Sequence, residues 1–416
     1  MNKSQRFMNL EGLRGVAAIV VVAYHITTLF YPGIAYGHDP VSAPIQHMRF
    51  EDNLYGSPLN VFLSGGFAVG IFFVLSGFVL SIGFFQTGKE AIIKKLASKR
   101  YLRLMLPALA SVILSFVLLS LHFTANRDAA VAVTHSGLPG EWSFAPNFID
   151  VLRQGTFGIF FNSETYYNPV LWTMMYEFIG SFVVFVFLFL FGKSNYRWLV
   201  YAALAMATFG TWYLGFIIGT VIADLYARKK LPFYGGSRVF AAGLLIVGLL
   251  IGGYPFGVAD GTVYNLIHLS WMTNSANTAV YISIGAALVT VGLLSLSRLS
   301  NFFASSRVSR LGKYTYSLYL THYLIVLTLT TSLFVLFNRS MGYNKSAVFA
   351  GICTVPVIIA VTWLFERYVD APAIKFANYF SDIHHKNRQV KLAALFKQYA
   401  LNVKPEPMPE AEEVMK

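Results

Sequence analysis

The chain has 416 residues, of which 56% are hydrophobic, 16% aromatic and only 12% charged. This charged fraction is about half of that usual in soluble domains, which excludes an ordinary water-soluble globular protein. The formal net charge of +13 raises nucleic acid as a possible partner. The distribution of the basic residues along the chain, described below, argues against that partner.

Apolar runs long enough to cross the roughly 30 Å hydrocarbon core of a bilayer recur along the chain. Because unpaired backbone groups are costly in lipid, each run is predicted to form a helix. The expected fold class is all-α, a polytopic membrane helical bundle of about ten transmembrane helices with cytoplasmic N- and C-termini. The predicted spans are 12–31, 59–85, 103–123, 170–191, 197–210, 211–227, 238–254, 278–297, 314–337 and 346–369.

Basic residues alternate between the predicted loops. If the N-terminus is cytoplasmic, the inner segments hold 27 of the 32 Lys and Arg residues, and the outer loops hold only five. This is the positive-inside distribution of membrane proteins. We therefore interpret the basic excess as a topology signal and expect the lipid bilayer, with no nucleic acid, as the partner.

Two segments outside the spans stand out, the C-terminal tail and one long outer loop. A membrane domain is predicted at 1–376, followed by a polar cytoplasmic tail at 377–416 that is partly disordered. The outer loop 124–169 is rich in aromatic residues. Its rings predict either an aromatic belt at the lipid surface or a lid that stacks on a sugar, and the sequence leaves both open.

Ionisable residues inside spans mark function or a necessary internal pair, because they are costly in lipid. Arg14 and His25 are eleven residues apart in the first span, which places them on one stripe of the helix, about 16 Å apart along its axis. Glu177, in the fourth span, is predicted at the depth of His25. A carboxylate beside an imidazole supports proton transfer from a hydroxyl, so His25 and Glu177 are the candidate catalytic residues. A purely structural pair is the alternative.

A basic cluster of Lys99, Arg100 and Arg103 lies on the same predicted cytoplasmic side as Arg14. Such clusters usually anchor the topology. They also suit a phosphorylated cosubstrate, because the arginine fork matches phosphate oxygens. The cluster therefore predicts either an anchor or a binding site for such a cosubstrate.

Three further polar residues extend the candidate site. His322, with Tyr319 one turn before it, predicts either an interhelical hydrogen-bond network or one wall of a polar cavity. Ser76 is a candidate for a covalent acyl relay, although a serine beside a glycine in a helix also allows close packing. The spacing of His, Cys and acidic residues predicts no metal site, and the single cysteine excludes an internal disulfide.

Six segments, in this order, resemble motifs of the acyltransferase-3 family of integral membrane O-acyltransferases. The resemblance spans Asn9 to about Phe376. The segments are "LEGLRGVAAIVVVAYH", "GIFFVLSGF", "KRYLRLMLP", "LWTMMYEF", "LGKYTYSLYLTH" and "FERYVDAPA".

The resemblance implies transfer of an acyl group, most often acetyl, from cytoplasmic acyl-CoA to a hydroxyl of a surface or exported molecule. Acetyl-CoA is then a cosubstrate, and no cofactor is bound permanently. The implied acceptor is a carbohydrate or a lipid-linked glycan, and the expected location is the bacterial inner (cytoplasmic) membrane. The sequence does not indicate an oligomeric state.

The resemblance also implies roles for individual residues. The arginine and histidine of the family's first helix correspond to Arg14 and His25, and its glutamate corresponds to Glu177. The donor-binding residues are then Arg14, Lys99, Arg100 and Arg103. Residues of the substrate site or cavity are Tyr319, His322, Ser76 and Trp172, and Glu366 matches the motif that closes the tenth helix.

A proton-coupled transporter is the rival interpretation. His25, Glu177 and His322 would then form a proton relay across the bilayer. No inverted repeat is visible in the sequence, which counts weakly against a transporter.

Overall fold

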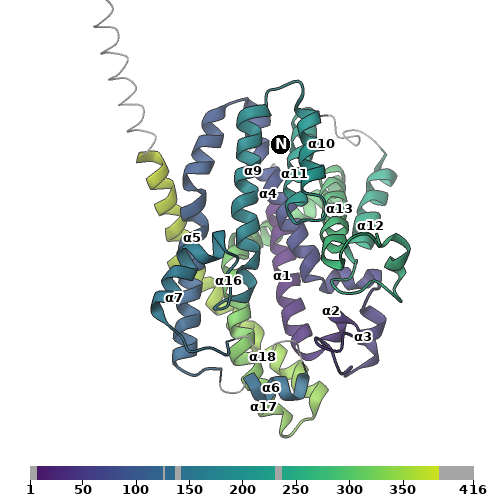
Figure 1. Ribbon diagram of the computed structural model, residues 1–416, viewed down its shortest axis with the longest axis vertical. Helices are drawn as coiled ribbons and strands as arrows, with labels where there is room; N and C mark the ends of the chain where they lie inside the picture. The colour runs from purple at the N-terminus through teal and green to yellow at the C-terminus, as the bar shows by residue number, and fades with distance from the viewer. Residues whose placement is uncertain (1–6, 125–126, 136–141, 230–236, 384–416) are drawn as a thin grey trace, which may run out of the picture.

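The computed structural model describes residues 7–124, 127–135, 142–229 and 237–383, which form an all-α bundle (Figure 1). Within these ranges, seven helical segments are long and apolar enough to cross a membrane. They are Met8–Phe30 (α1), Gly65–Thr87 (α4), Glu90–Ser120 (α5), Pro169–Phe191 (η3 and α9), Asn274–Ser295 (α13), Ser306–Asn338 (α15 to α17) and Tyr343–Ile383 (α18 and its continuation).

Three shorter apolar helices complete the counterparts of the ten predicted spans: α10 (Arg197–Ala207), α11 (Tyr213–Ala227) and α12 (Arg238–Gly252). At 1.5 Å per residue even the longer two reach only about 22 Å, less than a hydrocarbon core. The predicted runs were longer because they counted the apolar residues of the connecting turns. The all-α membrane bundle is thus confirmed, and the sidedness of its termini stays a prediction.

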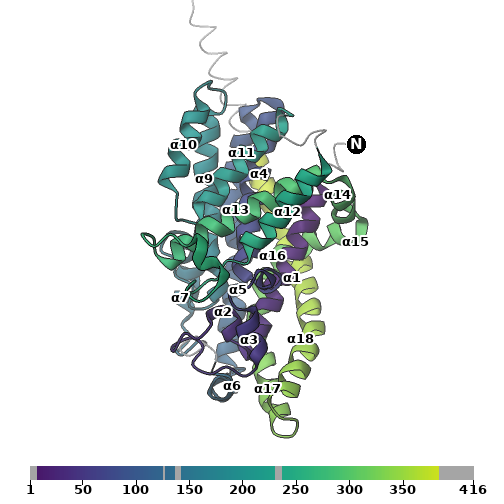
Figure 2. The same cartoon turned by 90° about the vertical axis from the view of Figure 1, so that its right-hand side faces the viewer.

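Shorter elements connect these helices or form parts of them. In Figures 1 and 2 the short helices α2, α3, α6 and α17 gather at one end of the bundle, away from the N-terminus. The remaining bounds are α2 Gly33–Tyr36, α3 Arg49–Leu54, η1 Pro58–Leu63, α6 Arg127–Thr134, α7 Phe148–Arg153, η2 Gln154–Gly158, α8 Ile159–Phe161, η3 Pro169–Leu171, α9 Trp172–Phe191, η4 Val263–Ile267, α14 Ser297–Ala304, α15 Ser306–Ser309, η5 Arg310–Tyr314, α16 Thr315–Ile325, η6 Val326–Thr330, α17 Thr331–Asn338, α18 Tyr343–Phe365 and η7 Glu366–Asp370.

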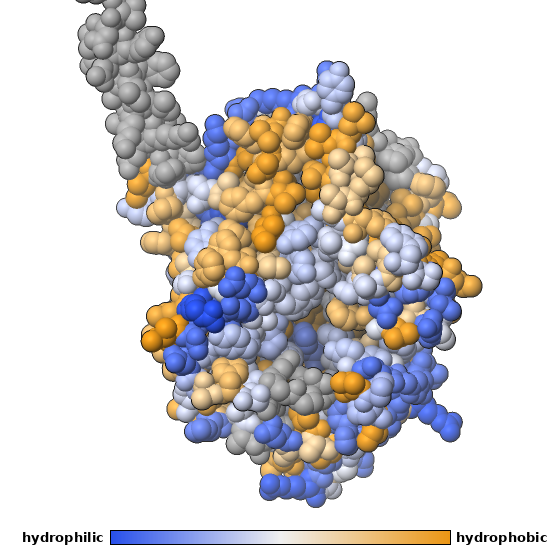
Figure 3. All heavy atoms as spheres, in the orientation of Figure 1, coloured by the Kyte–Doolittle hydropathy of each residue, from blue (hydrophilic) through white to orange (hydrophobic). Residues whose placement is uncertain are grey.

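Part of the outer surface of the helices is apolar, as contact with a bilayer requires. Figure 3 shows hydrophobic residues gathered over the upper half of one face, where α9 and α10 lie. Phe189, Leu190 and Leu199 are at least half exposed there. Such side chains are stable when lipid covers them.

Close backbone packing of α4 against α11 forms the centre of the bundle. A Cβ atom on Gly77 would lie 2.1 Å from the carbonyl oxygen of Phe216, and one on Gly219 would lie 2.0 Å from that of Val74. Small residues allow such close approach, which is a main source of helix association in membranes, where lipid tails are as apolar as leucine.

Three aromatic rings from the described part of the loop 124–169 pack into the bundle. Phe160 and Tyr167 are fully buried, and the indole N–H of Trp142 donates a hydrogen bond to the Tyr167 carbonyl at 2.7 Å. The side-chain amide of Asn168 donates to the carbonyl of Leu320 on α16 at 3.0 Å. Trp142, Phe160 and Tyr167 are thus part of the protein core. For these three rings neither predicted role applies, the aromatic belt at the lipid surface or the lid on a sugar.

The predicted boundary at residue 376 falls inside a helix that continues to Ile383. Residues 384–416, most of the predicted tail, lie outside the described residues. The division into a membrane domain and a tail therefore stays a prediction.

We expect Gly77→Ala to destabilise the protein by about 1–3 kcal/mol, because the added methyl group forces α4 and α11 apart. Thermal unfolding of the detergent-solubilised protein measures the effect. Gly243→Ala on α12 is the matched control, since a Cβ there meets nothing within 4 Å. Equal melting temperatures for the two variants would contradict the proposed close packing.

Candidate active site

Two adjoining cavities lie among α1, α4, α9 and α16. The first, of about 460 Å³, is lined by Arg14 at the start of α1, and we name it the Arg14 cavity. The second, of about 250 Å³, is lined by His25 nearer the other end of α1, and we name it the His25 cavity. Val69 and Tyr319 line both, so the cavities meet at these two side chains.

The Arg14 cavity contains equal numbers of cations and carboxylates. Its cationic lining residues are Arg14, Arg100, Arg103 and Lys313, and its acidic ones are Glu11, Glu177, Glu366 and Asp370. Burying unpaired charges is costly, which accounts for this pairing.

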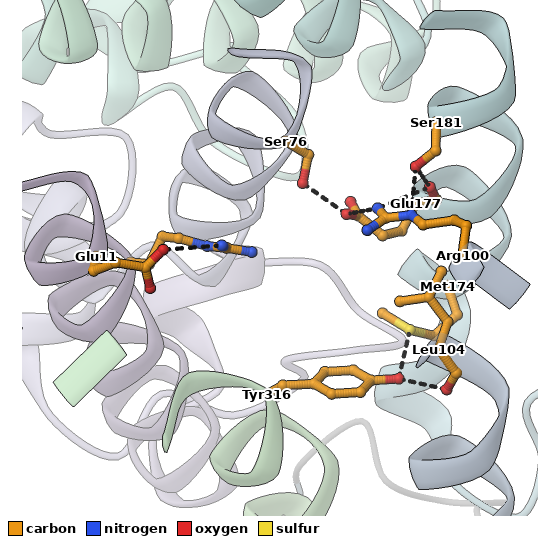
Figure 4. A network of polar contacts seen from close by, with 9 residues as sticks. Glu11, Ser76, Arg100, Leu104, Met174, Glu177, Ser181 and Tyr316 are labelled. Carbon is orange, nitrogen blue, oxygen red and sulfur yellow. Dashed lines mark hydrogen bonds and ion pairs between the residues drawn. The ribbon is translucent and has the colours of Figure 1, made fainter. Parts of the chain in front are cut away.

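Glu177 is held by partners from two other helices. The Arg100 guanidinium of α5 forms an ion pair with Glu177 Oε1, and the Ser76 hydroxyl of α4 donates to the same oxygen at 2.6 Å (Figure 4). Arg100 also donates to the Ser181 hydroxyl at 2.8 Å. In Figure 4, Glu11 lies on the opposite side of the cavity. Ser76 and Arg100 thus hold Glu177 between α4 and α5.

The other three ion pairs differ in tightness. Arg103 Nη1 lies 2.5 Å from Asp370 Oδ1, and Lys313 Nζ lies 3.1 Å from Glu366 Oε2. Arg14 Nη1 lies 3.6 Å from Glu11 Oε1, and its buried Nε has no hydrogen-bond partner among the residues that the structure describes. Arg14 therefore has the most unused donor capacity of the four cations.

A π-helical turn positions two of the carboxylates. Glu366 and Asp370 are the first and last residues of η7, and both line the Arg14 cavity. Single π turns inside α-helices occur frequently at functional sites. The widened turn places both carboxylates on the side of the helix that faces the cations.

The His25 cavity has a different chemistry, because none of the described residues that line it carries an acidic, lysine or arginine side chain. Aromatic rings form much of its wall, including Tyr24, Trp172 and Tyr323. At the boundary with the Arg14 cavity, the Tyr319 hydroxyl is hydrogen-bonded with that of Thr173 at 2.7 Å. The His25 imidazole therefore faces a space whose described lining side chains are uncharged, with aromatic rings and hydroxyl groups among them.

His322 packs behind His25. Their ring centroids are 5.2 Å apart, and the Tyr323 ring lies 4.6 Å from that of His25. His322 Nδ1 lies 2.8 Å from the Leu318 carbonyl oxygen, which can only accept, so Nδ1 carries a hydrogen and donates. Its Nε2 is buried without a hydrogen-bond partner. In the neutral ring, Nε2 is then an unused acceptor next to His25.

The predicted pairing of His25 with Glu177 is wrong. No hydrogen bond or ion pair joins them in the part of the chain that the structure describes, and they line different cavities. Trp172, the first residue of α9, already lines the His25 cavity, so Glu177 lies about 7.5 Å further along the helix. The prediction measured depth from an assumed membrane edge, whereas the chain before α9 is buried in the protein.

Lys99 is the second departure from the predicted site. Its Nζ donates to Asn378 Oδ1 at 2.9 Å, and it does not line the Arg14 cavity. Consecutive residues of a helix point about 100° apart, so Lys99 and Arg100 cannot share one direction.

The remaining predicted residues border the cavities or pack beside them. Arg14, Ser76, Arg100 and Arg103 line the Arg14 cavity, Trp172 lines the His25 cavity, and Tyr319 lines both. Sequence reasoning missed Lys313 and Asp370 as site residues, although both lie in segments that carry the family resemblance. Lys313 pairs with Glu366, and Asp370 pairs with Arg103. The second of these pairs joins segments that are far apart in the chain, so it is seen only in the folded protein.

The fold and the two cavities define a polytopic membrane protein with a buried polar site. A family model described as an acyltransferase domain matches residues 8–367. The chain therefore belongs to the acyltransferase-3 family, as the resemblance predicted, and it is a membrane acyltransferase.

Two curated proteins are similar over nearly their whole length. Acyltransferase clz18 of Cochliobolus lunatus is 24% identical over 88% of this chain and 94% of its own. Acyltransferase R4 of Phoma sp. (strain ATCC 20986 / MF5453) is 25% identical over 88% of this chain and 94% of its own. No solved structure gives a significant match.

We expect Arg100→Gln to destabilise the protein by about 3–5 kcal/mol, because it leaves the Glu177 carboxylate buried without its cation. The double variant Arg100→Gln/Glu177→Gln should recover most of this loss. Unfolding in detergent measures three variants: Arg100→Gln, Glu177→Gln and the double variant.

Lys193→Gln is the matched control, because its ion pair with Glu90 is exposed and should contribute less than about 1 kcal/mol. If the two losses at Arg100 and Glu177 simply add, the ion pair does not stabilise the fold.

Proposed function

We propose that the protein transfers an acyl group, with acetyl as the expected group, from acyl-CoA to a hydroxyl of an acceptor. The observation that supports this best is the division of the site: a cavity lined by paired cations and carboxylates meets a neutral cavity that holds His25. The charged cavity suits the phosphates of the donor, and the neutral cavity suits a hydroxyl that reacts with the thioester.

In this proposal the donor enters the Arg14 cavity. Arg14 is the first cation to engage a phosphate, because its carboxylate partner is the most distant and its Nε is unpaired. The planar guanidinium can bind two phosphate oxygens at once. The thioester then reaches past Val69 and Tyr319 toward His25.

His25 acts as the general base. It takes the proton of the acceptor hydroxyl as the oxygen attacks the thioester carbonyl carbon. The carbon–sulfur bond then breaks, an ester forms, and His25 returns the proton to the departing CoA thiolate. Histidine suits both steps because its ordinary pKa, about 6.5, lies near neutral pH.

His322 takes the orienting role that was predicted for Glu177. Its Nε2, as an acceptor beside His25, can receive the ring N–H that points away from the acceptor hydroxyl. Such a bond selects one tautomer of His25, as the carboxylate does in catalytic triads. Glu177 instead belongs to the donor cavity.

The identities of the acceptor and of the membrane stay predictions. The family resemblance predicts a cell-surface or exported glycan in a bacterial inner membrane. The two similar proteins are from fungi, so the likeness to them does not favour a bacterial membrane.

Incubating the purified protein with acetyl-CoA and candidate acceptors tests the reaction. An acyltransferase releases free CoA thiol only as an ester forms, and mass spectrometry identifies that ester. The rival, a proton-coupled transporter, should release no thiol under any of these conditions.

We expect His25→Ala to lower the transfer rate by about 10²- to 10⁴-fold, the usual contribution of a general base. Membrane insertion and thermal unfolding should stay close to those of the native protein, since the side chain lines a cavity. Near-native transfer by this variant would refute the role of His25.

We expect His322→Phe to lower kcat by up to roughly 100-fold, because a misoriented His25 loses its productive geometry. The shape of the kcat-against-pH profile should change with it. His322→Gln, which keeps an acceptor, should recover part of the rate. A purely structural role would leave the pH profile unchanged and give no recovery by glutamine.

A further inference from the structure

The four cations that line the Arg14 cavity differ in their access to solvent. The exposed fraction of the side chain is 56% for Lys313, 31% for Arg14, 28% for Arg103 and 16% for Arg100. Tyr319, where the two cavities meet, is buried. Among these four cations Lys313 therefore lies nearest to the end of the cavity that opens to solvent.

A close backbone contact holds Lys313 beside the helix that carries Arg14. A Cβ atom on Gly312 of η5 would lie 2.6 Å from the carbonyl oxygen of Glu11 on α1 and 2.7 Å from its Oε2. Glu11 Oε1 lies 3.6 Å from Arg14 Nη1. Lys313 directly follows Gly312, so the segment that carries Lys313 and the arginine both adjoin Glu11.

The ion pair of Lys313 leaves part of its ammonium group accessible. Lys313 Nζ lies 3.1 Å from Glu366 Oε2, and the glutamate side chain is only 7% exposed. An ammonium group has three N–H donors, and this carboxylate occupies its buried side. The exposed side of Lys313 can therefore bind a second anion while the pair with Glu366 persists.

The two inner cations are less available to an anion. Arg100 is paired with Glu177 and Arg103 with Asp370, and both carboxylates are mostly buried. Drawing a cation away from a buried carboxylate leaves a charge without a partner, which is costly, whereas exposed charges exchange partners at little cost. A phosphate in this cavity is therefore met by the two outer cations.

The chemistry of CoA determines its direction in the cavity. The thiol ends the pantetheine arm, the diphosphate follows at the other end of that arm, and the ribose beyond the diphosphate carries the 3′-phosphate. In the proposed reaction the thioester lies near Tyr319, at the buried end of the cavity. The 3′-phosphate is then the phosphate nearest to solvent.

We propose that Lys313 binds the 3′-phosphate of CoA and that Arg14 binds the diphosphate, which makes Lys313 a residue that determines the specificity for the donor. This inference rests on the proposed function, because it takes acyl-CoA as the donor and directs its thioester toward His25. Arg100 and Arg103, which the sequence predicted to bind the donor, then hold carboxylates and contact no phosphate.

CoA and 3′-dephospho-CoA test this inference without knowledge of the acceptor, because they differ by one phosphate. Isothermal titration calorimetry of the purified full-length protein in detergent gives both dissociation constants. We expect Lys313→Gln to weaken binding of CoA about tenfold, as expected for one charged hydrogen bond at a half-exposed side chain, and to change that of 3′-dephospho-CoA less than about twofold. Arg14→Gln should weaken binding of both ligands by similar factors.

Three further variants separate phosphate binding from the stability of the fold. Lys313→Gln leaves the buried Glu366 unpaired, whereas Lys313→Gln/Glu366→Gln removes both charges and should show the same selective loss for CoA. Lys313→Arg keeps a cation and should keep the preference for CoA. Lys375→Gln is the matched control: it changes an exposed lysine that follows Ile374 of the cavity wall but does not line the cavity, and it should leave both constants unchanged.

The outcomes distinguish this inference from the proposed function. Equal weakening of both ligands in the single and the double variant would overturn the assignment of Lys313 to the 3′-phosphate and keep acyl-CoA as the donor. A loss for CoA in Lys375→Gln as large as that in Lys313→Gln would also overturn it, because overall charge would then account for both. Absence of CoA binding by the native protein would overturn the proposed donor together with this inference.

Discussion

The pairing of every cation in the Arg14 cavity with a carboxylate is the constraint on which the site depends. Charges inside a bilayer protein are stable only when partners from other helices neutralise them. Arg100 on α5 holds Glu177 on α9, and Arg103 on α5 holds Asp370 in η7. These pairs fix the relative positions of three segments that are far apart in the chain, and they leave room between them for an anionic ligand.

The pairing of charges also separates the charged Arg14 cavity from the neutral His25 cavity. Charged groups gather on the α1 N-terminal side of Tyr319, and the described residues that line the other side carry no acidic, lysine or arginine side chain. A phosphorylated donor and an uncharged acceptor can therefore occupy neighbouring spaces that meet at Val69 and Tyr319. His25 lies on the neutral side, where no charged side chain among the described lining residues competes for the hydroxyl that it is proposed to activate.

Much of this arrangement could be predicted from the sequence. The apolar runs predicted the helices, and the eleven-residue spacing placed Arg14 and His25 on one stripe. The structure agrees, since the two residues line consecutive cavities along α1. Contacts within one helix follow from its 3.6-residue period, so local spacing is sufficient to predict them.

Contacts between helices could not be predicted in the same way. The sequence predicted the wrong partner for Glu177, because the depth at which α9 begins depends on the buried chain before it. Lys99 and Arg100 are neighbours in sequence, yet only Arg100 lines the cavity. The sequence by itself determined the family, the membrane setting and the helices, since these follow from composition, local pattern and motif order. Only the tertiary structure decided which carboxylate meets which cation and what surrounds His25, because rotation and depth of each helix are set by packing against its neighbours.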